Sequence, residues 1–247
     1  MTYTVNLSFP YGYSSENCAE ISTFYYTDGD LAFPTLAKTV NLLGFARVIN
    51  PVLLVGIGYP EQTILEWFER RNLDLLPVEF EAPTVYENLT GITPETGKAL
   101  DFINFIKKQV IPLVESQNCE PKERILAGYS NGGTFANYVL FKHTNVFDKY
   151  IIGAQNDEHG LSVVYAYEEE YAERNKDLNK AVHFSVGTED DENFYYTNQM
   201  LLTLSKRNYP NLKMSHHIIS GGTHIDSLTE FYQESIITMA PYQKTTN

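Results

Sequence analysis

The chain has 247 residues and carries 18 Lys and Arg against 31 Asp and Glu, which gives a formal net charge of −13. Binding to a nucleic-acid backbone requires clustered cationic side chains, so this charge argues against a nucleic-acid partner. Hydrophobic residues make up 43% and charged residues 20% of the sequence, a balance that predicts a packed core and excludes a disordered chain.

The first residues contain neither the basic region nor the apolar run of a secretory signal, and no run reaches the length of a membrane-spanning helix. We therefore expect a cytoplasmic protein with no membrane partner, unless a leader has been removed. Cys18 and Cys119 have no CxxC spacing, which favours reduced thiols, with one disulfide as the alternative. No motif specifies an oligomeric state.

Short apolar segments, typical of strands buried on both faces, recur along the whole chain. No repeat, low-complexity tract or Pro/Gly/Ser-rich linker separates them, so residues 1–247 are expected to form a single domain. In chain order, the predicted strands cover residues 21–26, 51–57, 124–127, 150–154, 183–186 and 216–219.

Segments with helical periodicity lie between these strands. The clearest spans residues 99–114, and Thr93 and Pro94 are its expected N-cap and first helical residue. Pro112 lacks an amide hydrogen, so a kink or an end near Ile111 is expected. Further helices are predicted within 134–141, 196–204 and 228–239. The alternation predicts an α/β fold, in which helices cover both faces of a mostly parallel central sheet.

Residues 156–180 interrupt this alternation with tyrosines among glutamates. One interpretation is a solvated acidic helix whose tyrosines pack beneath it. The alternative is a small lid or insertion in which Tyr165 and Tyr167 contact a substrate, because a tyrosine offers both a ring and a hydroxyl. Tyr129 is a third candidate substrate-binding residue.

The sequence GYSNG at residues 128–132 lies between a predicted strand and a predicted helix. This G-x-S-x-G pattern in that setting is typical of a nucleophile elbow, a strained turn that lifts a serine above the sheet. The glycines allow the strand and the helix to approach closely. Ser130 is therefore the candidate nucleophile, and a glycine-serine turn without chemistry is the alternative.

A serine nucleophile requires a base and an orienting acid, which follow it in the order acid, then histidine, in this fold. Among six histidines, His224 follows the last predicted strand and precedes the last helix, so it is the candidate base, with a surface loop histidine as the alternative. Asp190 follows the preceding strand and is the favoured acid, and Glu189 is the reserve.

Backbone amides are expected to stabilise the negative charge that develops on the substrate oxygen. The amide of Asn131 directly follows the serine at a helix N-terminus and is the first candidate. The second is the amide of Asp30, in the turn at residues 27–31. The alternative interpretation of that segment is a tight turn with no further role.

Six segments together resemble the putative esterase family, which includes enzymes of the esterase D type, feruloyl esterases and ferric enterobactin esterases. The resemblance implies an α/β-hydrolase fold, an acyl-enzyme mechanism without a cofactor or metal, and catalytic roles for Ser130, Asp190 and His224. Arg71 and Asp74 match a family segment, and an Arg–Asp pair that fixes a loop is the preferred interpretation. The matching segments are 24–30 (FYYTDGD), 55–59 (VGIGY), 71–77 (RNLDLLP), 128–133 (GYSNGG), 187–190 (GTED) and 221–224 (GGTH).

The predicted function is therefore a serine carboxylic-ester hydrolase that acts on a small-molecule ester. A thioesterase or acyl transferase would use the same residues, and a non-catalytic binding protein with the same fold is the alternative from another class. The negative charge disfavours strongly anionic substrates, so neutral or aromatic esters are expected.

Overall fold

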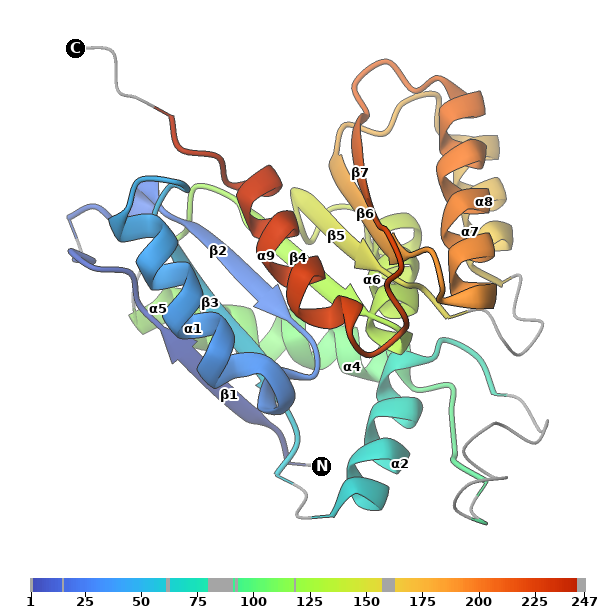
Figure 1. The fold of residues 1–247 in the computed structure, drawn as a ribbon, viewed down its shortest axis with the longest axis horizontal. Helices are drawn as coiled ribbons and strands as arrows, with labels where there is room; N and C mark the ends of the chain where they lie inside the picture. The colour runs from blue at the N-terminus through green and yellow to red at the C-terminus, as the bar shows by residue number, and fades with distance from the viewer. Residues whose placement is uncertain are drawn as a thin grey trace.

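The computed structural model describes residues 2–14, 16–60, 63–79, 91, 93–117, 119–156 and 163–243. These residues build a seven-stranded sheet with the strand order β1-β3-β2-β4-β5-β6-β7 (Figure 1). β1 pairs with β3 in the antiparallel sense, and all the other neighbouring strands are parallel. The strands are Thr4–Ser8 (β1), Ser22–Tyr26 (β2), Val52–Gly58 (β3), Arg124–Tyr129 (β4), Lys149–Gly153 (β5), Ala181–Gly187 (β6) and Lys213–Ile219 (β7).

The predicted α/β architecture is confirmed, and each of the six predicted strands overlaps one of β2 to β7. Strand β1 has no counterpart among the predictions. It lies at the edge of the sheet and its five residues are all half-buried, so it lacks the continuous apolar run that marks the central strands.

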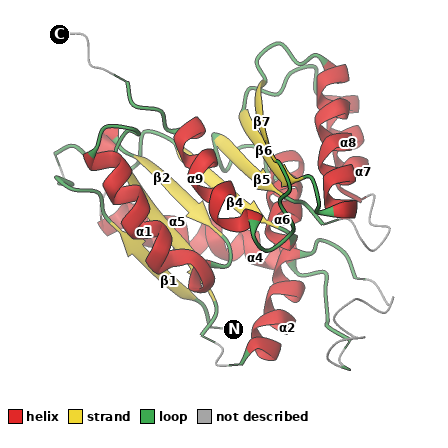
Figure 2. Ribbon diagram, in the orientation of Figure 1, coloured by secondary structure: helices red, strands yellow, loops and turns green. Residues whose placement is uncertain are grey.

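Helices cover both faces of the sheet (Figure 2). Helices α1 and α9 pack on one face, and α4, α6, α7 and α8 contribute to the apolar core on the other. Among the described residues, no helix combines the length and the apolar character that crossing a membrane requires. The helices are Gly29–Phe45 (α1), Ile64–Leu75 (α2), Ala99–Phe105 (α4), Ile111–Gln117 (α5), Asn131–Lys142 (α6), Val163–Arg174 (α7), Asp191–Arg207 (α8) and Ser227–Met239 (α9).

The helical region around Pro112 is interrupted at the expected place. A π-helical stretch, Ile106–Val110, separates α4 from α5, and it ends just before Pro112. A π-bulge changes the hydrogen-bond pattern of a helix, which lets the chain continue past a residue without an amide hydrogen. The expected start at Thr93 and Pro94 is wrong, because α4 begins at Ala99. Before it, the amide of Lys98 is bonded to the carbonyl of Leu73.

Cys18 and Cys119 form a disulfide with their Cα atoms 6.0 Å apart, so the expectation of reduced thiols is wrong. Cys18 begins a short 3-10 helix, Cys18–Glu20, that leads into β2, and Cys119 lies in the segment that leads into β4. Because β2 and β4 are parallel neighbours, the segments that lead into them lie side by side. Disulfides persist mainly in oxidising compartments, so the bridge removes the support that free thiols gave to a cytoplasmic location.

Candidate active site

Ser130 occupies the tight turn between β4 and α6. Its backbone has φ 60° and ψ −125°, a conformation that residues other than glycine rarely adopt. A side chain at Gly128 would overlap the backbone of Gly132, and one at Gly132 would overlap Thr27. The two glycines thus permit the geometry of a nucleophile elbow, as the GYSNG motif predicts.

The imidazole of His224 contacts the carboxylate of Asp190, with Nδ1 and Oδ2 2.8 Å apart. Asp190 is buried after β6, whereas its neighbour Glu189 is exposed. The two loops meet because β6 and β7 are parallel neighbours. Contact through Nδ1 orients the ring and leaves Nε2 as the nitrogen available for proton transfer.

Asn193, in the first turn of α8, completes the surroundings of this carboxylate. Its Nδ2 donates to the Oδ1 of Asp190 at 2.9 Å and lies 3.2 Å from the Nδ1 of His224. Both oxygens of Asp190 are therefore engaged. Asn193 is not predicted from the sequence, because it belongs to no motif. The one local pattern that could have indicated it is its position three residues after the acid, at the start of a helix.

Tyr129 holds the loop that carries the histidine. Its hydroxyl donates to the backbone carbonyl of His224 at 2.9 Å, and the centroids of the two rings are 5.2 Å apart. Burial, together with the nearby carboxylate of Asp190, raises the pKa of the Tyr129 phenol above its ordinary value. The phenol therefore keeps its proton and remains a donor to this loop.

Ser130 and His224 line the same pocket, which has a volume of about 450 Å³. Most of its wall is apolar, and Leu31, Ile64 and Ile225 are 57%, 62% and 77% exposed. Such a wall favours an uncharged ligand. The other lining residues are Asp28, Ala32, Trp67, Phe68, Arg71, Tyr129, Leu228 and Tyr232.

Asn131, the residue after Ser130, has side-chain hydrogen bonds to two other asparagines. The side chain of Asn131 donates from Nδ2 to the Oδ1 of Asn72 at 2.6 Å and accepts at its Oδ1 from Asn156 at 2.9 Å. Asn131 and Asn72 are almost completely buried. Because Asn131 is the first residue of α6, these contacts fix the direction of its backbone amide at the helix N-terminus.

A buried ion pair supports the turn after β2. Arg71 donates from Nε and Nη2 to the two carboxylate oxygens of Asp28, at 3.0 and 2.8 Å. Asp28 has a left-handed backbone with φ 54° and directly precedes α1. The expected pair of Arg71 with Asp74 is therefore corrected, because the ion pair that Arg71 forms is with Asp28, and Asp74 lies 3.9 Å from Arg70.

Asp30, whose amide is the second expected donor, is not among the described residues that line this pocket. The Asp30 nitrogen lies against Gly58, where a side chain would overlap it, and its carboxylate accepts a hydrogen bond from the Tyr59 amide at 3.3 Å. Asp28 and Leu31 line the pocket from the same segment.

Tyr165 and Tyr167 lie outside the residues that line the pocket. The Tyr165 hydroxyl donates to the carbonyl of Tyr196 at 2.7 Å, and the Tyr167 ring packs against Tyr138 of α6. Helix α7 therefore matches the acidic helix with tyrosines packed beneath it. Residues 157–162, which belong to the segment 156–180 expected to form an acidic helix or a lid, lie outside the described residues.

Residues 1–224 match the protein family described as "Putative esterase". The chain belongs to this family. The match ends at His224 and includes Ser130 and Asp190.

Two curated relatives have esterase names. The chain is 27% identical over 154 residues to a siderophore triacetylfusarinine C esterase of Aspergillus fumigatus, a match covering 60% of this chain and 49% of that protein. It is 29% identical over 139 residues to the ferri-bacillibactin esterase BesA of Bacillus subtilis, covering 53% of this chain and 46% of that protein. These matches therefore span about half the length of each relative.

The fold of this esterase-family chain is also found in a solved structure, that of the BES protein from Bacillus cereus. The two superpose with a TM-score of 0.82 at 23% identity, over 96% of this chain and 90% of that one. The likeness supports the assignment of an α/β-hydrolase fold.

Proposed function

We propose that the chain is a serine esterase that hydrolyses carboxylic esters through an acyl-enzyme on Ser130. The observation that carries the proposal is the 2.8 Å contact between His224 and Asp190 beside a pocket that Ser130 also lines. A serine hydroxyl is a weak nucleophile and needs a neighbouring base, which an oriented imidazole supplies. Membership of the esterase family supports the same chemistry.

In the proposed reaction, the Oγ of Ser130 attacks the ester carbonyl carbon while the Nε2 of His224 takes the hydroxyl proton. The carboxylate of Asp190 stabilises the imidazolium that forms. The tetrahedral intermediate then loses the alkoxide, which the imidazolium protonates. Water, deprotonated by the same imidazole, attacks the acyl-enzyme, releases the carboxylic acid and regenerates the serine.

Two backbone amides are assigned to the oxygen of the tetrahedral intermediate. One is the amide of Asn131, which heads α6 and is favoured by the dipole of that helix. We assign the second to a backbone amide of the turn at Asp28, which directly precedes α1 and borders the pocket. The contacts of Arg71 with Asp28 and of Asn72 with Asn131 hold these donors in place without taking part in a bond-making step.

The mostly apolar wall favours neutral or aromatic esters as substrates. The names of both curated relatives refer to siderophore esters, so siderophore esters are the first natural substrates to test. The net charge of −13 opposes strongly anionic forms of such molecules, an effect that added salt would reduce.

The test is hydrolysis of p-nitrophenyl acetate by the purified chain and by Ser130→Ala. The parent is expected to release p-nitrophenol and to react with a fluorophosphonate probe, and the variant to do neither. A parent that neither turns over the ester nor reacts with the probe would favour the non-catalytic alternative.

A second panel separates the chemically related alternatives. It compares an oxygen ester, the matching thioester, and the oxygen ester with an added alcohol acceptor. A thioesterase would prefer the thioester, and an acyl transferase would form the new ester faster than the free acid. The proposal expects hydrolysis of the oxygen ester to dominate.

A further inference from the structure

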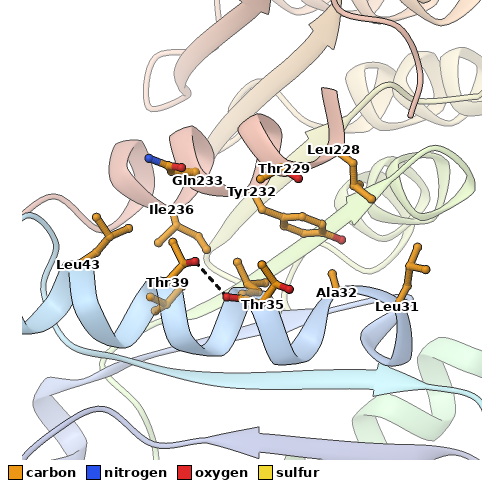
Figure 3. A pocket seen from close by; sticks show the side chains of 12 residues that line it. Leu31, Ala32, Thr35, Thr39, Leu43, Leu228, Thr229, Tyr232, Gln233 and Ile236 are labelled. Atoms are coloured by element: carbon orange, nitrogen blue, oxygen red, sulfur yellow. Dashed lines mark hydrogen bonds between the residues drawn. The ribbon is translucent and has the colours of Figure 1, made fainter. Parts of the chain in front are cut away.

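An apolar groove runs between α1 and α9, the two helices on one face of the sheet (Figure 3). It has a volume of about 170 Å³. Leu31 lies at one end of its α1 wall and Leu43 at the other, a separation of about 18 Å along the helix axis. On the opposite wall, the residues of α9 extend from Leu228 to Ile236.

The groove adjoins the pocket that contains the serine. Leu31 and Ala32 of α1, and Leu228 and Tyr232 of α9, line both cavities. Both helices begin beside the pocket, so the groove leads away from Ser130 toward their C-terminal ends. The groove therefore lies next to the place where a substrate carbonyl would meet the serine, and it extends along the two helices.

The lining of the groove suits a hydrocarbon chain. Within the described part of the chain, its lining includes no Asp, Glu, Lys or Arg. Leu36, Val40 and Ile236 form buried apolar parts of the wall. The hydroxyl of Thr39 donates to the carbonyl of Thr35 at 3.0 Å, so this polar group is already satisfied within α1 (Figure 3).

We propose that the groove between α1 and α9 binds an aliphatic chain of the ester substrate while Ser130 attacks its carbonyl. This inference rests on the proposed esterase function and names a class of substrate for it. The charge-free lining and the shared residues select a flexible hydrocarbon over a polar arm. Each methylene transferred from water into such a groove favours binding by about fourfold, from about 0.8 kcal/mol per buried methylene.

The experiment measures kcat/KM for p-nitrophenyl esters from acetate to octanoate, in the parent and in Thr39→Trp. The parent is expected to gain up to about fourfold per methylene until the groove is filled. An indole at position 39 occupies the groove, so the ratio of octanoate to acetate is expected to fall by about tenfold or more, the worth of two or more methylenes.

Lys38→Trp is the matched control, because this exposed residue is adjacent on α1 and does not line the groove. It is expected to keep the parent's ratio. Gln233→Trp narrows the groove from α9 and is expected to lower the ratio in the same way, which covers the case in which Thr39→Trp does not fold.

A parallel series of n-alkyl acetates places the hydrocarbon on the alcohol side of the ester. If kcat/KM rises with chain length in either series and Thr39→Trp abolishes that rise, the proposal is supported, and the series identifies which side of the ester enters the groove. If kcat/KM does not rise with chain length in either series, or if Thr39→Trp keeps the parent's dependence on chain length, the proposal is overturned. Absence of acetate hydrolysis and probe labelling in the parent would instead contradict the esterase function itself.

Discussion

Asp190 and His224 meet across two loops that follow neighbouring parallel strands, with the Oδ2 of the acid 2.8 Å from the Nδ1 of the ring. Asp190 is 6% exposed, so the carboxylate acts on the imidazole with little screening by water. The ends of β6 and β7 bring the two loops together, and the hydroxyl of Tyr129 holds the loop that carries His224.

Replacing this acid should reduce turnover without removing the serine's reactivity entirely. Asp190→Asn is expected to lower kcat by roughly 10³–10⁴-fold, because the amide favours the wrong tautomer and does not stabilise the imidazolium. Glu189→Gln is the matched control and should keep the parent's kcat, since Glu189 is exposed. Steady-state kinetics with p-nitrophenyl acetate measure both. The reverse ranking of the two variants would make Glu189 the triad acid.

Asn193 is expected to act as a positioning residue for that acid. Asn193→Ala removes the donor to the Oδ1 of Asp190, and a hydrogen bond to a charged group contributes about 1.5–3 kcal/mol, so kcat should fall by about tenfold or more. The acidic limb of the pH profile of kcat/KM should shift as well.

Asn198→Ala is the control for this prediction, because the Asn198 side chain donates to the carbonyl of Phe194 within the same helix. It should keep the parent's kcat and pH profile. A loss of activity in Asn193→Ala with an unmoved pH profile would assign Asn193 a general structural role in α8.

The parts of the site that the sequence predicts are those encoded by local patterns. Ser130 is recognisable because a glycine-flanked serine stands between an apolar strand and a helix. Asp190 and His224 follow strands that are themselves clear, and parallel strands bring their following loops to one edge of the sheet. Most central strands are predicted for the same reason, since burial on both faces leaves continuous apolar runs.

The parts that the sequence does not predict depend on contacts between distant segments or on backbone handedness. The partner of Arg71 is Asp28, 43 residues away, and only the packing of α2 against the turn after β2 selects it. Asp28 and Asp30 are chemically identical, and no local pattern in the sequence shows that Asp28 lines the pocket while Asp30 contacts the end of β3. Helix α1 is not predicted from the sequence, because Pro34 lies inside it and a turn-like sequence precedes it.

The ion pair between Arg71 and Asp28 is expected to matter for stability as well as for the site. Their side chains are 5% and 9% exposed, and removing one partner of a buried pair leaves an uncompensated charge. Arg71→Leu should therefore lower the free energy of unfolding by about 3–5 kcal/mol, measured by urea denaturation.

Arg174→Leu provides the contrast, because Arg174 is 72% exposed in its contact with Glu170. Loss of this exposed ion pair should lower the free energy of unfolding by only about 0–1 kcal/mol. Equal effects of the two substitutions would mean that the Arg71–Asp28 contact does not stabilise the fold.

The disulfide between Cys18 and Cys119 closes a loop with a sequence separation of 101 residues. Restricting so long a loop in the unfolded chain should stabilise the fold by about 4–5 kcal/mol in the chain-entropy description. A reductant should therefore lower the Tm of the parent and leave that of the Cys18→Ala/Cys119→Ala double variant unchanged. Detection of two free thiols in the unfolded, unreduced parent would contradict the bridge.

His183 should make the fold sensitive to mild acid. Burial, with the charges of His217 and His216 as lesser causes, lowers the pKa of His183 from 6.5 to about 4. Between these values the unfolded chain binds a proton that the folded chain does not, so stability rises with pH across this window and is lost as pH falls through it, by about 3 kcal/mol in total. Denaturation in urea at several pH values should show a smaller loss between pH 7 and 4.5 in His183→Phe than in the parent. Identical losses would mean that the buried imidazole is protonated in the fold.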